Sequence, residues 1–213
     1  MWAFSLFQAF LTTWPPSRPY RGFMMRTIIL VLAVTNFALF AVALRMLFAR
    51  ERRTPLPTRV MVDVGVVISC LHVYGLATAP LKTSAVEIAA ALYVVAAALF
   101  TWAALSVRGR GFKLAYVPNS PNAVFTGGPY RWFRHPLYLS YALAWIAGAV
   151  ATMSVPLLFT AAAMIAFYVG AAYREERQML RSAAGDDYRA YRRQAGVLLP
   201  KSLLLGDRSV GSV

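Results

Sequence analysis

The sequence predicts an all-α fold, a polytopic transmembrane helical bundle of about five spans with a C-terminal helical hairpin and cytoplasmic amphipathic helices. Three observations predict it. Hydrophobic residues make up 59% of the 213 residues, and the mean hydropathy of +0.55 is well above that of soluble proteins. The apolar residues form long runs, as a membrane requires. The chain has 22 Lys and Arg against 8 Asp and Glu, and most basic residues lie between the runs.

The composition also excludes several classes of protein. A disordered chain would need low hydrophobicity. One cysteine excludes a disulfide framework, and two histidines leave too few ligands for a typical zinc site, so we expect no metal. The basic residues are dispersed over the predicted loops, so the net charge of +14 does not indicate a nucleic-acid partner.

Three apolar runs predict the first three spans, because a hydrocarbon core of about 30 Å needs about 20 apolar helical residues. The runs cover residues 28–48, 60–79 and 88–107. Arg45 lies near the end of the first run, where its long side chain reaches the interface. Trp102 lies towards the end of the third run, which is typical of an interface anchor.

A further apolar stretch, residues 137–173, is too long for one span. It is interrupted at residues 152–156, where Pro156 suits the first turn of a new helix. We therefore expect a helical hairpin with spans over about 137–151 and 155–173. The first of these is short, so we expect it to tilt or to cross the bilayer incompletely.

The connections between the runs differ in charge, and this difference predicts their side of the membrane. Residues 45–59 and 108–134 are rich in arginine, whereas residues 80–87 contain one lysine and residues 152–156 contain no charge. The positive-inside rule then places the two basic loops and the C-terminal tail in the cytoplasm. Basic loops beside spans also predict a bilayer with anionic headgroups as a partner.

The N-terminal region has two interpretations. Five spans would place the N-terminus outside, but Arg18, Arg21 and Arg26 oppose that placement. Residues 1–14 either lie in the interface as an amphipathic segment or dip into the membrane and return. Both interpretations stay open.

The first candidate site is the segment 127–138, immediately before the predicted hairpin. Pro136 fits the first turn of a helix, and His135 would stand at its N-terminal opening. Free backbone N–H groups and the helix dipole suit an anion there. Tyr138 would face inward one turn later. The alternative is an ordinary basic and aromatic membrane interface.

The second candidate site is the pair Glu175 and Glu176 at the end of the last span. Adjacent helical residues point about 100° apart, so we expect one carboxylate to turn towards the first site. The hairpin returns the chain to the same membrane face. A carboxylate there can hold an ammonium group or ribose hydroxyls. The alternative is a salt bridge to Arg174 or Arg177.

The tail continues at helical spacing. Apolar and aromatic positions recur at Leu180, Ala184, Tyr188, Tyr191 and Ala195, with Gly185 as a break. The intervening positions are mostly polar, so we expect two short amphipathic cytoplasmic helices.

Together, these motifs resemble the isoprenylcysteine carboxyl methyltransferase family, whose signature phospholipid methyltransferases share. The matching residues are Gly128-Pro129-Tyr130-Arg131, Arg134-His135-Pro136-Leu137-Tyr138, Glu175-Glu176-x-x-x-Leu180, Gly185-x-x-Tyr188-x-x-Tyr191 and Pro200. The resemblance covers about residues 110–200. It implies an N-terminal part with three spans, residues 1–107, and a methyltransferase core, residues 108–213.

The resemblance implies an S-adenosylmethionine site on the cytoplasmic face. The residues that would bind the cofactor are Asn122, Ala123, Val124, Phe125, Tyr130, His135, Pro136, Leu137, Tyr138 and Glu176. Ser140 stands where the family commonly has glycine, a change that we expect to be tolerated. The eukaryotic enzymes have a substrate-binding Arg where this chain has Ala172 or Tyr173, so substrate specificity does not transfer.

The function implied is that of an integral membrane S-adenosylmethionine-dependent methyltransferase acting on a small lipophilic or lipid acceptor. Few polar residues suffice, because the cofactor carries its own leaving group. We favour a carboxylate acceptor, oriented by Arg134 or Arg174. An amine acceptor would use Glu175 or Glu176 as its base, and a thiol is also compatible.

Two other functions compete with this one. Sterol reductases resemble the family in their C-terminal spans, so an NADPH-dependent membrane reductase is one alternative. A non-enzymatic membrane scaffold is the other. Two ionisable residues lie inside the second apolar run. We expect His72 to be a hydrogen-bonded packing residue and Asp63 to pair with Arg59.

Overall fold

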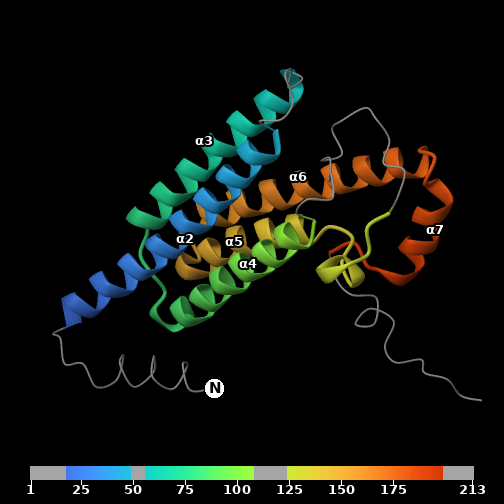
Figure 1. The fold of residues 1–213 in the computed structure, drawn as a ribbon. Coiled ribbons are helices and arrows are strands. Elements are labelled where there is room, and N and C mark those ends of the chain that lie inside the picture. The colour runs from blue at the N-terminus through green and yellow to red at the C-terminus, as the bar shows by residue number, and fades with distance from the viewer. Residues whose placement is uncertain (1–17, 49–55, 108–123, 199–213) are drawn as a thin grey trace, which may run out of the picture.

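The computed structural model describes residues 18–48, 56–107 and 124–198, and the regular elements in these ranges are all helical (Figure 1). The elements are α2 (Arg18–Phe48), α3 (Leu56–Thr78), η1 (Thr83–Ala85), α4 (Val86–Val107), η2 (Gly128–Arg131), α5 (Pro136–Thr152), α6 (Val155–Leu180) and α7 (Gly185–Gln194). The prediction of an all-α fold is confirmed.

All five predicted runs are helical, and within the described residues three helices are long and apolar enough to cross a membrane. These three segments are Tyr20–Ala43, Thr83–Val107 and Val155–Leu180. Asp63–Thr78 and Pro136–Thr152 are shorter apolar helices. The expectation that the first arm of the hairpin is short is therefore confirmed.

Two helices extend further than the apolar runs predict. Helix α2 begins at Arg18 and not at residue 28, with Pro19 in its first turn, where the missing N–H costs nothing. Helix α6 continues past residue 173 to Leu180. Hydropathy marks only the part of a helix that lipid can surround, so polar extensions escape it.

The predicted hairpin forms at the expected place. The Met153 backbone adopts a left-handed conformation with φ of 51°, and its N–H bonds to the Ala149 carbonyl at 2.7 Å. Ser154 is extended and precedes α6, whose first turn contains Pro156. The chain thus reverses within two residues.

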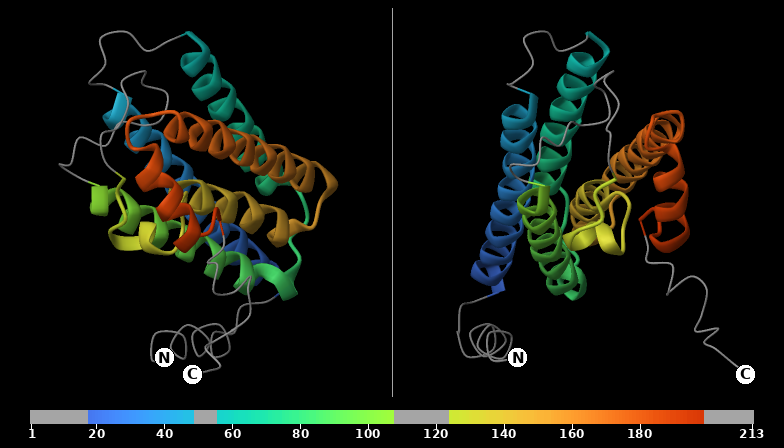
Figure 2. Two further views of the ribbon diagram at one scale, coloured as in Figure 1. Left: turned by 90° about the vertical axis from the view of Figure 1, so that its right-hand side faces the viewer. Right: turned by 45° about the vertical axis from the view of Figure 1, so that its right-hand side comes forward.

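Helix α5 is the centre of the bundle and packs against α2, α3, α4 and α6. Figure 2 shows it between α4 and α6. Its buried face combines Trp145 with small residues, Ala144, Ala147, Gly148 and Ala151. Small residues let helix backbones approach closely, which is how helices associate within a membrane.

The connections within the described residues lie at the two ends of the bundle. At one end, the Lys82 N–H bonds to the Ala151 carbonyl at 2.8 Å, so the α3–α4 connection meets the hairpin turn. Arg26 donates to the Ala77 carbonyl at the same end. At the other end, α6 extends beyond the bundle and α7 folds back beside the segment before α5 (Figure 1).

Candidate functional site

The two candidate sites meet where α5 begins, the last turns of α6 pass and α7 ends. We call Arg134, His135, Tyr138, Glu175, Glu176 and Arg192 the carboxylate cluster. Each of the other four side chains contacts at least one of the two glutamates. These residues are separated by up to 58 positions in the chain, so only tertiary folding brings them together.

A glycine allows the segment before α5 to sit against α4. Gly128 has φ of +57°, a backbone conformation that L side chains rarely adopt. A β-carbon here would clash with the Ser106 hydroxyl and lie 3.5 Å from the Trp102 indole nitrogen. Pro129 and Tyr130, which follow, are buried. The glycine therefore fixes where η2 leads into α5.

The chain after α7 holds this segment from the other side. The Arg134 N–H bonds to the Gly196 carbonyl at 2.7 Å, and the His135 N–H bonds to the Val197 carbonyl at 3.2 Å. The Tyr191 hydroxyl donates to the Tyr130 carbonyl at 2.6 Å. Backbone hydrogen bonds thus position Arg134 and His135 independently of their side-chain contacts.

Arg134 and Glu176 form a buried ion pair at the centre of the cluster. Arg134 Nε lies 2.8 Å from Glu176 Oε1, and their side chains are 6% and 3% exposed. Arg134 Nη1 donates to the carbonyls of Arg192 at 3.2 Å and Ala195 at 2.9 Å. Arg192 Nε lies 3.3 Å from Glu176 Oε2. Burying two charges is costly, and these additional hydrogen bonds compensate.

The second carboxylate, Glu175, lies beside the other nitrogen of the His135 ring. His135 Nε2 lies 3.2 Å from Glu176 Oε1, and Nδ1 lies 3.6 Å from Glu175 Oε2. The Tyr138 hydroxyl donates to Glu175 Oε1. We expected one of the adjacent carboxylates to turn inward, and both do.

Three rings form a nearly parallel row beside these carboxylates. The Tyr138 ring lies 5.6 Å from His135 at an interplanar angle of 18° and 5.7 Å from Tyr168 at 14°. The Tyr168 hydroxyl accepts a hydrogen bond from Trp145 Nε1 at 3.1 Å. The row thus links the cluster to Trp145, which is buried at the centre of the bundle.

The tyrosines of the tail stay neutral. Burial raises the pKa of Tyr188 and Tyr191, and Glu176 raises both further, while Arg134 opposes this effect. Burial likewise raises the pKa of Tyr130. A neutral phenol is what Tyr191 needs to donate to a carbonyl.

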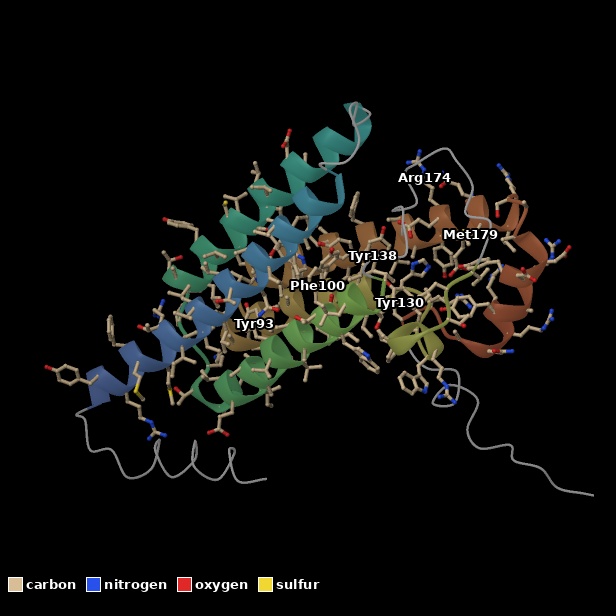
Figure 3. The ribbon with its side chains drawn as sticks, viewed as in Figure 1. Tyr93, Phe100, Tyr130, Tyr138, Arg174 and Met179 are labelled. Atoms are coloured by element: carbon tan, nitrogen blue, oxygen red, sulfur yellow. The ribbon has the colours of Figure 1, made fainter. Side chains whose placement is uncertain are left out.

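Of the predicted catalytic residues, the structure brings Arg134 and Glu175 into the cluster but not Arg174. Arg174 is exposed and points away from Tyr138 on the far side of α6 (Figure 3). The adjacent position, Glu175, points inward, as the helical rotation of about 100° per residue requires.

The remaining predicted cofactor residues surround the cluster. Pro136 is buried at the start of α5, Leu137 packs against Tyr130, and Phe125 lies edge-on to Tyr130 at 5.5 Å. Val124 packs against Tyr188 and Tyr191. Asn122 and Ala123 lie outside the described residues, as does the Arg59 side chain that we expected Asp63 to meet.

Sequence reasoning missed Arg192 and Tyr168. Arg192 is one of several arginines near the tail, and nothing in the pattern separates it from the others. Tyr168 lies two turns before Glu175 on the same face of α6, which is a usable signal. The spacing of Tyr188 and Tyr191 did indicate a helix in the tail, although it did not reveal the hydrogen bond from Tyr191 to the Tyr130 carbonyl.

Comparison with known proteins supports this grouping of motifs. Residues 89–181 match the model of the isoprenylcysteine carboxyl methyltransferase family. The match covers less than half of the chain. The match runs from α4 to just beyond α6, so it contains both glutamates and Arg134, while α7 lies outside it.

Two curated relatives share part of this sequence. The chain is 39% identical over 71 residues to methanethiol S-methyltransferase 1 of Bradyrhizobium diazoefficiens. It is 42% identical over 71 residues to methanethiol S-methyltransferase of Mycobacterium tuberculosis. Each alignment covers 33% of this chain, with 24% of the first relative and 28% of the second. The chain thus spans about a quarter of the length of these relatives. No solved structure matches it significantly.

Proposed function

We propose that this chain is an integral membrane methyltransferase that uses S-adenosylmethionine to methylate a small lipophilic thiol. The family match and the names of the two relatives support the reaction class. The observation that carries the choice of acceptor is that the Arg134 side chain is already hydrogen-bonded to groups of the protein itself.

The residues of the carboxylate cluster fit this cofactor. When bound, S-adenosylmethionine supplies an electrophilic methyl group on a cationic sulfonium. Two glutamates offer negative charge, and the rings of His135 and Tyr138 offer faces that attract a cation. The first turn of α5 contains no acidic residue. This helix N-terminus therefore suits the carboxylate in the amino-acid part of the cofactor.

The commitment of Arg134 argues against a carboxylate acceptor. Its guanidinium donates to Glu176 and to two backbone carbonyls, and it is nearly fully buried. Orienting a second carboxylate would require breaking this buried pair, which costs about 3–5 kcal/mol. Arg174, the other cation that we considered, faces away. A thiol needs no cation to orient it.

A thiol does need to lose its proton, because the thiolate is the nucleophile. Glu175 is the carboxylate available for this role. Its side chain is 16% exposed against 3% for Glu176, and it contacts His135 and Tyr138. In our proposal the thiol proton passes to Glu175, with Tyr138 and His135 fixing the orientation of its two oxygens.

The same proposal places the site at the cytoplasmic face of a bilayer with anionic headgroups. Arg177, Arg181 and Arg189 are exposed at the end of the molecule that carries the cluster. Arginines at this position are attracted to anionic lipid by about 1 kcal/mol each. Apolar side chains on the preceding turns of α6, such as Phe159 and Phe167, face outward towards lipid.

Cofactor binding by purified protein in detergent tests the proposal. We expect saturable S-adenosylmethionine binding that Glu176→Gln weakens about tenfold or more, because the variant removes a negative charge from the site and weakens the charged hydrogen bonds that hold Arg134 and His135 in place. Asp186→Asn is the matched control, since Asp186 is exposed and pairs only with Arg189 among the described residues. Thermal stabilisation by NADPH alone would overturn the proposal in favour of a reductase.

Turnover with methyl-labelled cofactor then tests the acceptor. Membranes are offered small alkyl thiols in one arm and a prenylated cysteine carboxylate in the other, and products are identified by mass spectrometry. We expect a labelled thioether and no labelled ester. Labelling of the carboxylate alone would contradict the thiol assignment while leaving the methyltransferase assignment intact.

A further inference from the structure

A second group of polar side chains lies deep in the bundle, far from the carboxylate cluster. His72 of α3 is 1% exposed and Tyr93 of α4 is 0% exposed. Both meet Gly148 of α5, and His72 also bonds to Thr160 of α6. Gly148 lies about 20 Å along α5 from His135, at 1.5 Å per residue. The group is therefore separate from the proposed methyl-transfer site.

We assign the tautomer of His72 from the hydrogen bonds around Thr160. The Thr160 hydroxyl has one proton, which it donates to the Leu157 carbonyl at 3.0 Å. His72 Nδ1 lies 2.8 Å from the same hydroxyl oxygen. Nδ1 must then carry the imidazole proton and donate it to Thr160. His72 Nε2 is left as an acceptor.

Two buried polar atoms then have no hydrogen-bond partner within the described part of the chain. They are His72 Nε2, an acceptor, and the Tyr93 hydroxyl, a donor. Leaving such buried atoms unpaired destabilises a fold, so native structures rarely contain them. Both converge on Gly148: a β-carbon there would lie 2.9 Å from the Tyr93 hydroxyl oxygen and would overlap His72 Nε2.

We propose that His72, Tyr93 and the bare Cα of Gly148 form a binding site for one water molecule. Water accepts a hydrogen bond from the Tyr93 hydroxyl and donates one to His72 Nε2, so it satisfies both atoms at once. Aromatic rings limit the size of the site, since Trp145 lies 4.7 Å and Phe37 6.1 Å from the His72 ring. Glycine at position 148 is required because a β-carbon would overlap His72 Nε2 and crowd the Tyr93 hydroxyl.

The site would join three helices and support the aromatic row. The His72 ring packs edge-on against Trp145, whose Nε1 donates to Tyr168. Tyr168 in turn stacks on Tyr138, a member of the carboxylate cluster. A fixed His72 thus fixes the position of the rings between the water site and the cluster.

Nitrogen NMR of the protein in bilayers tests the site directly, because the chain has only two histidines. With ¹⁵N-labelled histidine, the His72 signals are identified by their loss in His72→Phe. We expect a protonated Nδ1, an unprotonated Nε2 and magnetisation transfer from water to Nε2 that Tyr93→Phe weakens. A proton on Nε2, or no transfer from water in the unsubstituted protein, would overturn the inference.

Thermal unfolding in the same bilayers gives an independent measurement. Tyr93→Phe removes only the hydroxyl, and we expect it to lower the Tm by several degrees. The matched control is Tyr74→Phe, on the exposed face of α3, which should leave the Tm unchanged. Equal Tm values for the two variants would contradict the site, whether or not methyl transfer is confirmed.

Discussion

Glu176 divides its two carboxylate oxygens among Arg134, His135 and Arg192. Its burial is tolerated because every oxygen is bonded, and the same contacts explain why Arg134 is an arginine. A guanidinium reaches Glu176 and two carbonyls at fixed angles, whereas an ammonium is a single point charge.

We therefore predict that Arg134→Lys destabilises the fold strongly. The lysine cannot bond to Glu176 and both carbonyls together, which leaves a buried carboxylate incompletely paired. The expected loss in the free energy of unfolding is about 3 kcal/mol, measured by denaturant titration in detergent. Arg189→Lys, at an exposed pair with Asp186, should change it by less than about 0.5 kcal/mol. Similar losses in the free energy of unfolding for both variants would contradict the importance of the Arg134 guanidinium and its several hydrogen bonds.

At the scale of elements, η2 and the tail after α7 act together as supports for the start of α5. Neither is apolar enough to be detected by hydropathy. Both hold their positions through backbone conformation and backbone hydrogen bonds, which side-chain patterns do not reveal.

Gly128→Ala should disrupt the η2 support. The alanine would have to adopt a positive φ, at a cost of about 1–2 kcal/mol, and displace the Ser106 hydroxyl. Gly170→Ala is the control, because Gly170 is helical with open space around it and should gain about 0.5–1 kcal/mol. Thermal unfolding measures both, and a neutral Gly128→Ala would refute the role assigned to this glycine.

Tyr191→Phe should loosen the tail. It removes a donor that bonds to the carbonyls of Tyr130 at 2.6 Å and Phe133 at 3.3 Å, a loss of about 1–3 kcal/mol. The pH dependence gives a second readout. Burial raises the pKa of Tyr191, so the unfolded chain ionises first and stability falls as pH rises above about 10. The variant should show a smaller fall, and an unchanged alkaline profile would count against this explanation.

At the scale of the whole molecule, the bundle has two chemically different ends. The Lys82 connection and the hairpin turn meet at one end, and the carboxylate cluster lies at the other. The charge asymmetry of the sequence predicts that the end with the cluster faces the cytoplasm.

Cysteine labelling tests that orientation. Cys70 lies on the exposed face of α3 and is first replaced by alanine. We expect Arg189→Cys to react with a membrane-impermeant maleimide only in inverted vesicles, because α7 would face the cytoplasm. Glu87→Cys, at the start of α4, should react only in right-side-out vesicles. The reverse pattern would place the site on the outer face.

The sequence by itself determined the helical class, the hairpin break and most residues of the site. Hydropathy runs follow from what lipid can surround, and the Arg-His-Pro-Leu-Tyr and Glu-Glu motifs are contiguous in the chain. Only the tertiary structure decided that both glutamates face inward, that Arg174 does not, and that Arg192 and Tyr168 join them. Those outcomes depend on the rotation of α6 against α5 and on the path of the tail, and contacts between distant segments leave no periodic signal in one sequence.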